Sequence, residues 1–258
     1  MPYVTNEGIR IHYEVDGDGP PLVLQHGFTQ KVKSWEMAGY VDALKPLYRL
    51  IRVDARGHGD SDKPHDPAAY TLSRHVSDIV AVLDVLNLRT AHFWGYSMGG
   101  WIGFGMAKYA PQRVDALMIG GAQPYERTLR VSRPDGSDPQ AFLKNLFGRL
   151  GVNPLDALPS ERRAELLAND FLALAAAQQD RPSLEDILPT LKMPSFLYVG
   201  EADGIFPQVK ACVKQMTNVT FVSFPGFDHA DAFYRADAVL TPITEFLQAQ
   251  QERMKAVV

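Results

Sequence analysis

The sequence predicts an α/β domain whose central sheet is mostly parallel and covered by helices, with a small helical insertion. Short runs rich in β-branched and aromatic residues recur along the chain, and most are apolar throughout, as in strands buried on both faces. Helical patterns of the length that a crossover connection needs lie between these runs. One long stretch, residues 122–189, breaks the alternation, because it has helical patterns but no convincing strand.

The expected strands are bounded by Gly, Pro or Asp. They are Ile9–Val15, Leu22–Gln25, Tyr48–Val53, Ala91–Gly95, Ala116–Gly120, Phe196–Gly200 and Val219–Phe224. The expected helices between and after them are Leu72–Leu86, Met98–Tyr109, Gln208–Met216 and Ala236–Gln250. The link Asp16–Pro21 is rich in turn residues and too short for a helical crossover, so we expect the sheet to open with antiparallel strands.

Residues 122–189, called the insertion below, contain three helical patterns separated by Pro and Gly: Pro139–Leu150, Ser160–Asp170 and Phe171–Gln179. We therefore divide the chain into a core of residues 1–121 and 190–258 and a helical cap of residues 122–189. An insertion that leaves an α/β sheet at a strand's carboxyl end lies over the crevice where ligands bind. The predicted role of the insertion is that of a lid.

Composition and charge narrow the class of protein. The chain has 258 residues, of which 46% are hydrophobic, so it is long enough to bury the core of one domain. The net charge is −4, and lysine and arginine never cluster beyond a dipeptide. Because nucleic acids and anionic membranes attract proteins through a positive field, we expect no nucleic-acid partner.

Membrane and secretion signals are not expected either. The longest continuous apolar stretch of consequence is Phe171–Ala177, well short of the roughly 20 residues that cross a bilayer. The start of the chain has neither a basic segment nor an apolar core typical of a cleaved signal, which favours a cytoplasmic location. A single cysteine, Cys212, excludes an internal disulfide, and phosphate-loop, dinucleotide and zinc-protease motifs are missing. We therefore expect no metal and no cofactor.

The segment Gly95-Tyr96-Ser97-Met98-Gly99 matches Gly-x-Ser-x-Gly, in which a serine lies on a strained turn between a strand and a helix. The local context agrees, since an apolar run precedes it and a helical pattern begins within it. A serine hydroxyl is a weak nucleophile that needs an adjacent base, itself oriented by an acid. We therefore predict that Ser97 is a nucleophile.

The base and the acid follow from chain order, which in such folds is serine, acid, histidine. Only His229 among the seven histidines lies beyond Ser97, so it is the predicted base. The acid is expected directly after the strand that ends at Gly200. Asp203 is the preferred residue there, while Glu201, nearer to the strand and longer in reach, remains an alternative.

Acyl transfer also needs hydrogen-bond donors where the carbonyl oxygen becomes negative. Backbone N–H groups of Met98, directly after the nucleophile, and of Phe28, in the loop Gln25-His26-Gly27-Phe28-Thr29, are the predicted donors. We assign His26 to bracing this loop rather than to proton transfer. We expect the Gln25 side chain to hydrogen-bond within the sheet.

Taken together, these motifs resemble the α/β-hydrolase superfamily, in its branch of small esterases and lipase-like serine hydrolases. The resemblance is carried by His26-Gly27-Phe28, Asp54–Ser61, Gly95–Gly99, Gly200–Asp203 and Gly226–His229, and it covers nearly the whole chain outside the insertion. Part of the preference for Asp203 comes from this resemblance. Dehalogenases and epoxide hydrolases of this fold use a carboxylate nucleophile, so Ser97 disfavours both.

The resemblance implies an enzyme that cleaves small to medium, largely apolar carboxylic esters through an acyl-enzyme. A lactonase, a carbon–carbon hydrolase or a perhydrolase would use the same triad, and a ligand-binding receptor without turnover is the alternative from another class. Aromatic residues near the expected mouth or in the insertion predict an apolar substrate pocket. The candidate pocket residues are Trp35, Tyr125, Phe142, Phe147, Phe206 and Phe227.

Overall fold

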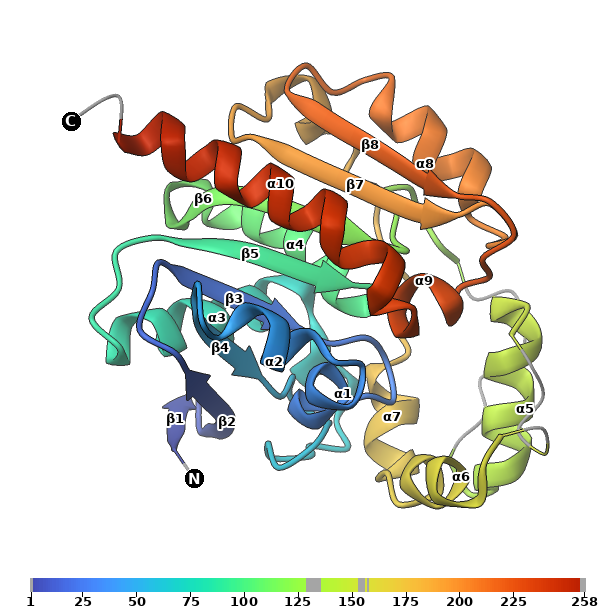
Figure 1. Ribbon diagram of the computed structural model, residues 1–258. Helices are drawn as coiled ribbons and strands as arrows, with labels where there is room; N and C mark the ends of the chain where they lie inside the picture. The colour runs from blue at the N-terminus through green and yellow to red at the C-terminus, as the bar shows by residue number, and fades with distance from the viewer. Residues whose placement is uncertain (1, 129–135, 153–155, 157, 256–258) are drawn as a thin grey trace.

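A computed structural model of the chain describes residues 2–128, 136–152, 156 and 158–255. Its centre is an eight-stranded sheet in the order β1-β2-β4-β3-β5-β6-β7-β8 (Figure 1). The strands are β1 (Tyr3–Asn6), β2 (Ile9–Asp16), β3 (Pro21–Gln25), β4 (Arg49–Val53), β5 (Ala91–Tyr96), β6 (Val114–Gly120), β7 (Ser195–Gly200) and β8 (Val219–Phe224). Strands β3 to β8 are parallel, whereas β2 runs antiparallel to both β1 and β4. The predicted fold class is thereby confirmed.

Every strand expected from the sequence is present, and the sheet does open with antiparallel strands. The short link Asp16–Pro21 nevertheless does not join neighbours, because β4 lies between β2 and β3. The edge strand β1 was not predicted from the sequence. It has only four residues and none of them is buried, so it lacks the apolar run that identifies the inner strands.

Helices cover both faces of the sheet (Figure 1). They are α1 (Val32–Met37), α2 (Tyr40–Leu44), α3 (Leu72–Val85), α4 (Met98–Tyr109), α5 (Pro139–Leu150), α6 (Ser160–Leu167), α7 (Phe171–Ala177), α8 (Phe206–Val213), α9 (Asp231–Tyr234) and α10 (Ala236–Lys255). Helices α3, α4 and α8 bury apolar side chains against one face, and α1, α2 and α10 against the other. Helices α1, α2 and α9 were not expected, because each is too short to show an amphipathic period.

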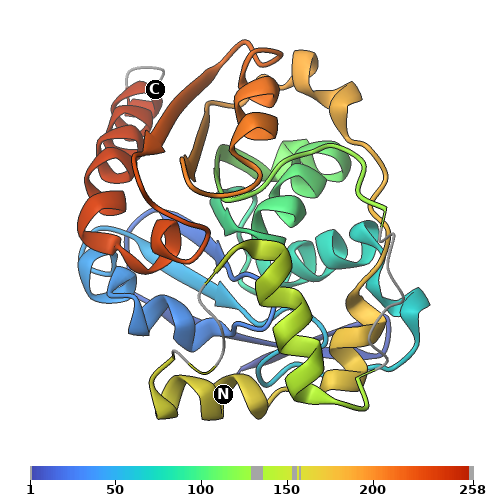
Figure 2. The same cartoon turned by 90° about the vertical axis from the view of Figure 1, so that its right-hand side faces the viewer.

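The insertion begins after β6 and lies beyond the carboxyl ends of the parallel strands, with α5 passing in front of them in Figure 2. Local signals explain α5: Asp138 accepts hydrogen bonds from the first free N–H groups, Pro139 starts the helix, and Gly151 ends it with a left-handed φ of 66°. The helices of the insertion have a small core of their own, made of Phe142, Leu143, Leu146, Leu166, Phe171 and Leu174.

No strand occurs among the described residues of the insertion. One isolated antiparallel bridge does occur, in which Arg127 and Arg181 exchange both backbone hydrogen bonds, each 2.9 Å from N to O. This bridge joins the segment that leaves the sheet after β6 to the segment that returns after α7. It therefore closes the base of the insertion next to the strand ends.

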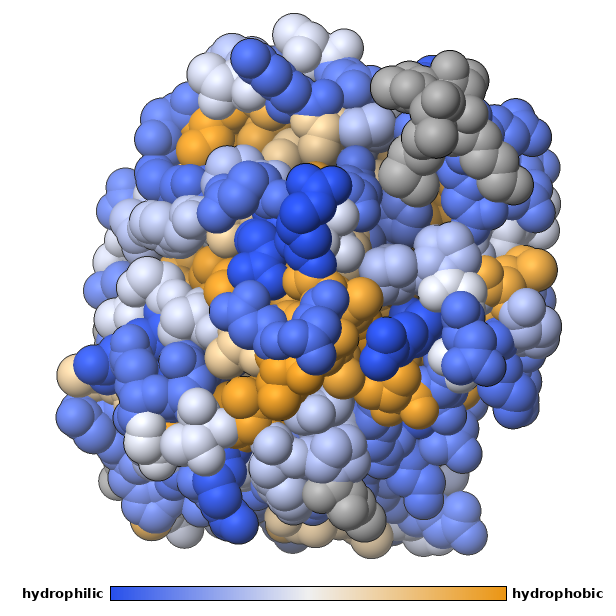
Figure 3. Space-filling view, turned by 90° about the vertical axis from the view of Figure 1, so that its left-hand side faces the viewer, coloured by the Kyte–Doolittle hydropathy of each residue, from blue (hydrophilic) through white to orange (hydrophobic). Residues whose placement is uncertain are grey.

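The opposite end of the molecule, where the parallel strands begin, shows mostly hydrophilic residues around a band of apolar ones (Figure 3). Across the described part of the chain, we find no helix with both the length and the apolar content needed to cross a membrane.

Candidate active site

Ser97 lies on a sharp turn between β5 and α4. Its backbone has φ 54° and ψ −110°, a conformation that residues with a side chain rarely adopt. A Cβ on Gly99 would lie 2.0 Å from the carbonyl oxygen of Gln25, and one on Gly95 would lie 2.0 Å from the carbonyl oxygen of Gly99. The two glycines of the motif are therefore required by contact, and the turn presents the serine hydroxyl at the sheet's carboxyl edge.

Two side chains from the same edge meet this serine. The Ser97 hydroxyl lies 2.9 Å from Nε2 of His229, which follows β8, and Nδ1 of His229 lies 2.5 Å from Oδ2 of Asp203, which follows β7. His229 and Asp203 are both buried. With the proton on Nδ1, the imidazole donates to the carboxylate and accepts from the serine at Nε2. The three predicted residues thus form one continuous hydrogen-bonded chain.

The competing acids lie elsewhere. Glu201 is exposed, and its carboxylate accepts a hydrogen bond from the hydroxyl of Ser223 at 2.7 Å. Asp228 accepts from the backbone N–H groups of Ala230 and Asp231, at 2.7 and 2.8 Å, and so organises the turn into α9. Among the described carboxylates, Asp203 is therefore the one that contacts the histidine.

A tyrosine that sequence reasoning missed holds the histidine loop. Tyr96, the residue before the serine, is buried, and its hydroxyl donates to the backbone carbonyl of His229 at 2.5 Å. Its ring centroid lies 5.4 Å from that of the imidazole. Because Tyr96 occupies the variable position of Gly-x-Ser-x-Gly, the motif carries no signal for this role.

The loop after β3 approaches the serine closely. A Cβ on Gly27 would lie 3.3 Å from Cβ of Ser97. The backbone N–H of Gln30 donates to Gly27, while the side chain of Gln30 accepts from the N–H of Gly27 at 2.8 Å. In this four-residue turn from Gly27 to Gln30, Phe28 is the first of the two central residues and Thr29, with φ 66°, is the second. Met98 is the first residue of α4, where the N–H has no carbonyl partner within the helix.

His26 and Gln25 have the bracing roles expected of them. His26 donates from Nδ1 to the carbonyl of Gly27 at 2.8 Å and accepts at Nε2 from the N–H of Ala55 at 3.1 Å. Burial lowers the pKa of His26, which agrees with a neutral ring in this arrangement. The amide of Gln25 donates to the carbonyl of Val53 at 3.2 Å, within the sheet.

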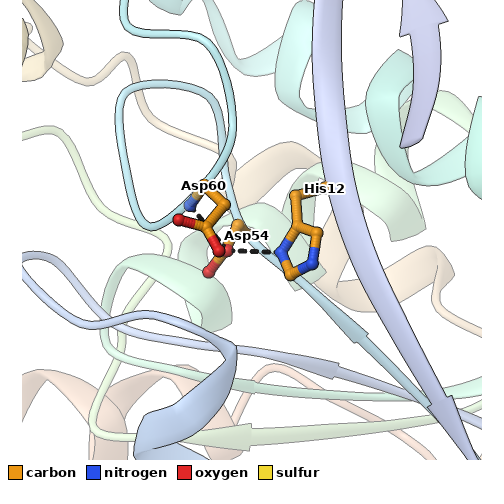
Figure 4. Close-up of side chains that lie close together, drawn as sticks. All are labelled: His12, Asp54 and Asp60. Atoms are coloured by element: carbon orange, nitrogen blue, oxygen red, sulfur yellow. Dashed lines mark hydrogen bonds and ion pairs between the residues drawn. The ribbon is translucent and has the colours of Figure 1, made fainter. Parts of the chain in front are cut away.

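His12, Asp54 and Asp60 bring three potential metal ligands close together (Figure 4). The carboxylate of Asp54 is already used by the fold, since it accepts from the N–H groups of Val32 and Asp60 and from Nδ1 of His12, at 2.7, 2.9 and 2.7 Å. Burial opposes ionisation of Asp54, but these hydrogen bonds outweigh it and leave its pKa lowered. The group acts as a structural brace for the turn after β4.

Two cavities meet at Ser97 and His229. The larger, about 150 Å³, is mainly apolar and includes Phe28, Phe147 and Leu166 among its walls. The smaller, about 80 Å³, has a mixed lining, in which apolar residues such as Leu150 and Ile205 lie beside polar groups from the base of the insertion. These groups are Gln123, Tyr125, Arg127 and Arg181. The catalytic candidates therefore lie between an apolar space and a space of mixed lining that includes two arginines.

The structure changes the list of candidate pocket residues. Phe147 lines the larger cavity and Tyr125 the smaller one. Four others line neither cavity. Trp35 is fully buried against Trp94, and Phe142 is fully buried in the insertion's own core. Phe227 stacks on Phe224, and the amine of Lys210 lies over the ring of Phe206. Sequence alone did not distinguish aromatic residues of the core from those at the site, because both kinds are apolar and flank strand ends.

Similarity to known proteins agrees with this geometry. A family model described as the alpha/beta hydrolase fold matches residues 20–195. A Bacillus subtilis (strain 168) protein provisionally named 2-succinyl-6-hydroxy-2,4-cyclohexadiene-1-carboxylate synthase is 37% identical over 133 residues, which are 50% of this chain and only 47% of that protein. A protein of Synechocystis sp. (strain ATCC 27184 / PCC 6803 / Kazusa), provisionally named non-heme chloroperoxidase, is 28% identical over 96% of this chain and 100% of its own length.

Among solved structures, the enol-lactonase from Burkholderia xenovorans LB400 is similar with a TM-score of 0.83 and 24% identity, covering 96% of this chain and 100% of that one. At this level of identity the likeness shows the fold alone. The family match spans more than half of the chain and supports a hydrolase. The chain therefore belongs to the alpha/beta hydrolase fold family.

Proposed function

We propose that the protein is a serine hydrolase that cleaves carboxylic esters through an acyl-enzyme. The observation that carries this proposal is the continuous hydrogen-bonded chain from Ser97 through His229 to Asp203, with distances of 2.9 and 2.5 Å. A serine, a base and an orienting acid in this order are the arrangement that activates a hydroxyl for attack on a carbonyl.

In the proposed reaction Ser97 attacks the ester carbonyl while its proton passes to Nε2 of His229. The imidazolium that forms is stabilised by Asp203 and then gives the proton to the departing alcohol. Water, activated by the same histidine, attacks the acyl-enzyme and releases the acid with the enzyme restored. The N–H groups of Phe28 and Met98 are the proposed donors to the oxyanion in both halves.

Both cavities support an ester as substrate, because an ester has two arms on either side of its carbonyl. The larger cavity offers an apolar wall to one arm, partly from Phe147 and Leu150 of the insertion. We therefore propose that the insertion acts as a cap that selects substrates rather than as a part of the catalytic machinery. None of the five proposed catalytic positions lies within it.

Turnover of a panel of p-nitrophenyl esters, from acetate to decanoate, tests the proposal together with the Ser97→Ala variant. We expect wild-type turnover of at least one ester and a loss of about a thousandfold or more in the variant, because truncation removes the nucleophile. The variant should remain folded, since the hydroxyl contributes little to packing.

Two results of these measurements would contradict the proposal. If every ester is left intact while an apolar ligand still raises the melting temperature, the protein is a receptor on this fold rather than an enzyme. Retention of more than a tenth of wild-type activity in Ser97→Ala would remove Ser97 from the mechanism.

A further inference from the structure

Two arginines face each other beside the proposed nucleophile without a described acidic partner. Arg127 and Arg181 form the isolated antiparallel bridge at the base of the insertion. Residues directly opposite each other in such a pair project their side chains to the same side, and like charges in this position are destabilising. Both arginines line the smaller cavity, which also includes Ser97 and His229.

Neither arginine forms an ion pair with a described carboxylate, in contrast to most of the arginines that the structure describes. Arg56 binds Asp78, Arg113 binds Asp84 and Arg162 binds Glu165, all within 3.1 Å. The Nε atom of Arg127 is buried and has no hydrogen-bond partner among the described residues. A buried donor of this kind costs free energy unless a ligand satisfies it.

The guanidinium of Arg181 is held in place by stacking. Its Cζ lies 4.3 Å from the ring centroid of Trp101, one helical turn after Ser97 on α4. The backbone N–H of Trp101 donates to the carbonyl of Ser97 at 3.0 Å. A guanidinium placed over an aromatic ring can still offer N–H groups to a planar acceptor. The cation is thus fixed relative to the nucleophile.

The electrostatics of the pair favour an anion. Burial lowers the pKa of Arg127 to about 10, the neighbouring cation Arg149 adds to this effect, and the carboxylate of Asp180 opposes it in part. Burial and the charge of Arg127 together lower the pKa of Arg181. A bound anion would offset the cost of burying the two guanidinium groups.

We infer that the smaller cavity binds a carboxylate carried by the substrate itself, so that the enzyme prefers esters bearing an acid group on one arm. A carboxylate matches the planar edges of two arginines, and a cavity of about 80 Å³ suits this group and a short linker. The larger apolar cavity takes the other arm. This inference rests on the proposed ester hydrolysis and names its substrate class.

Isosteric pairs of esters test the inference, with rates followed by release of the alcohol. Monobutyl glutarate has the carboxylate on the acyl arm, and butyl 5-methylhexanoate replaces it with an isopropyl group. The butanoate ester of 4-hydroxybutanoate has the carboxylate on the alcohol arm, and 4-methylpentyl butanoate is its neutral partner. We expect kcat/KM to favour the anionic member of at least one pair by about tenfold to a hundredfold.

Arginine variants identify the origin of that preference. Arg127→Gln and Arg181→Gln should each reduce the anionic-to-neutral ratio of kcat/KM about tenfold or more. Arg181→Lys should recover part of the preference. The control is Arg235→Gln, which removes the same charge from an exposed arginine that stacks on Phe227 and pairs with Asp237. It should leave the ratio unchanged.

Binding gives a readout that does not depend on turnover. Calorimetry of monobutyl glutarate with the Ser97→Ala protein should show binding that Arg127→Gln weakens about tenfold or more. The melting temperature of Arg127→Gln without ligand should not fall, because the change relieves repulsion between like charges.

The outcomes separate this inference from the proposed function. Neutral esters that are hydrolysed through Ser97, with no preference for the anion in either pair, would overturn the carboxylate site and leave the hydrolase intact. An unchanged anionic-to-neutral ratio in both arginine variants would do the same. If no ester of either kind is hydrolysed and monobutyl glutarate fails to bind the Ser97→Ala protein, both proposals fall.

Discussion

Among single residues, the two neighbouring acids Asp203 and Glu201 have different contacts and different expected roles. Asp203 contacts His229, whereas Glu201, two positions earlier, points to Ser223 at the surface. Asp203→Asn should lower kcat by about 10³- to 10⁴-fold, because the amide favours the wrong imidazole tautomer. Glu201→Gln is the matched control and should leave kcat unchanged. Equal losses in the two variants, measured on the best ester, would contradict the assignment.

Chain order and local motif were enough to single out Ser97 and His229 from the sequence. The choice between Asp203 and Glu201 was not decided locally, because both follow the same strand and only the turn direction separates them. Tyr96 gave no signal, since its role depends on a contact with the histidine loop, far along the chain. Arg127 and Arg181 are likewise distant in sequence and meet only through one isolated bridge.

At the scale of elements, helix α5 contributes to the insertion's own core and to the larger cavity. Phe142 is fully buried, stacks on Phe28 and meets Phe171 edge to face, whereas Phe147, on another side of the helix, lines the cavity. Phe142→Ala should lower the free energy of unfolding by about 3 to 5 kcal/mol through loss of packing. Phe147→Ala should instead shift the preferred ester chain length with little loss of stability.

Thermal unfolding and an ester series from acetate to decanoate distinguish the two phenylalanines. A large loss of stability in Phe147→Ala with unchanged substrate ranking would mean that the side chain supports the core and that the cavity wall lies elsewhere.

The strands of the core followed from their apolar runs. The short elements β1, α1 and α2 did not, because their order depends on the sheet against which they pack.

At the scale of the whole molecule, several buried histidines couple stability to pH. Burial lowers the pKa of His58 to about 3, and it also lowers the pKa values of His26 and His75. The unfolded chain binds protons at these sites near pH 6.5, while the folded chain stays neutral there. The free energy of unfolding should therefore decrease as the pH falls below about 6.5, and His58 alone should contribute about 1 kcal/mol of this loss over the first pH unit.

His12 acts in the opposite direction, because the hydrogen bond to Asp54 raises its pKa. Its stabilising contribution grows as the pH falls towards the unfolded pKa and is constant below it, so it offsets only part of the acid loss. Urea unfolding at pH 7.0 and 5.5 tests the balance in the wild type and in His58→Asn. The variant should lose about 1.4 kcal/mol less between the two pH values. Identical losses in both proteins would show that His58 is protonated in the folded state.

The central claim is that Ser97 carries the acyl group during turnover. Rapid acid quenching during hydrolysis of a p-nitrophenyl ester, followed by peptide mass spectrometry, measures this directly. We expect the mass of the acyl group on the peptide containing Ser97, formed within the burst of nitrophenol and absent from Ser97→Ala. Steady hydrolysis with no acylated peptide at any quench time, or with the acyl group on another residue, would contradict it.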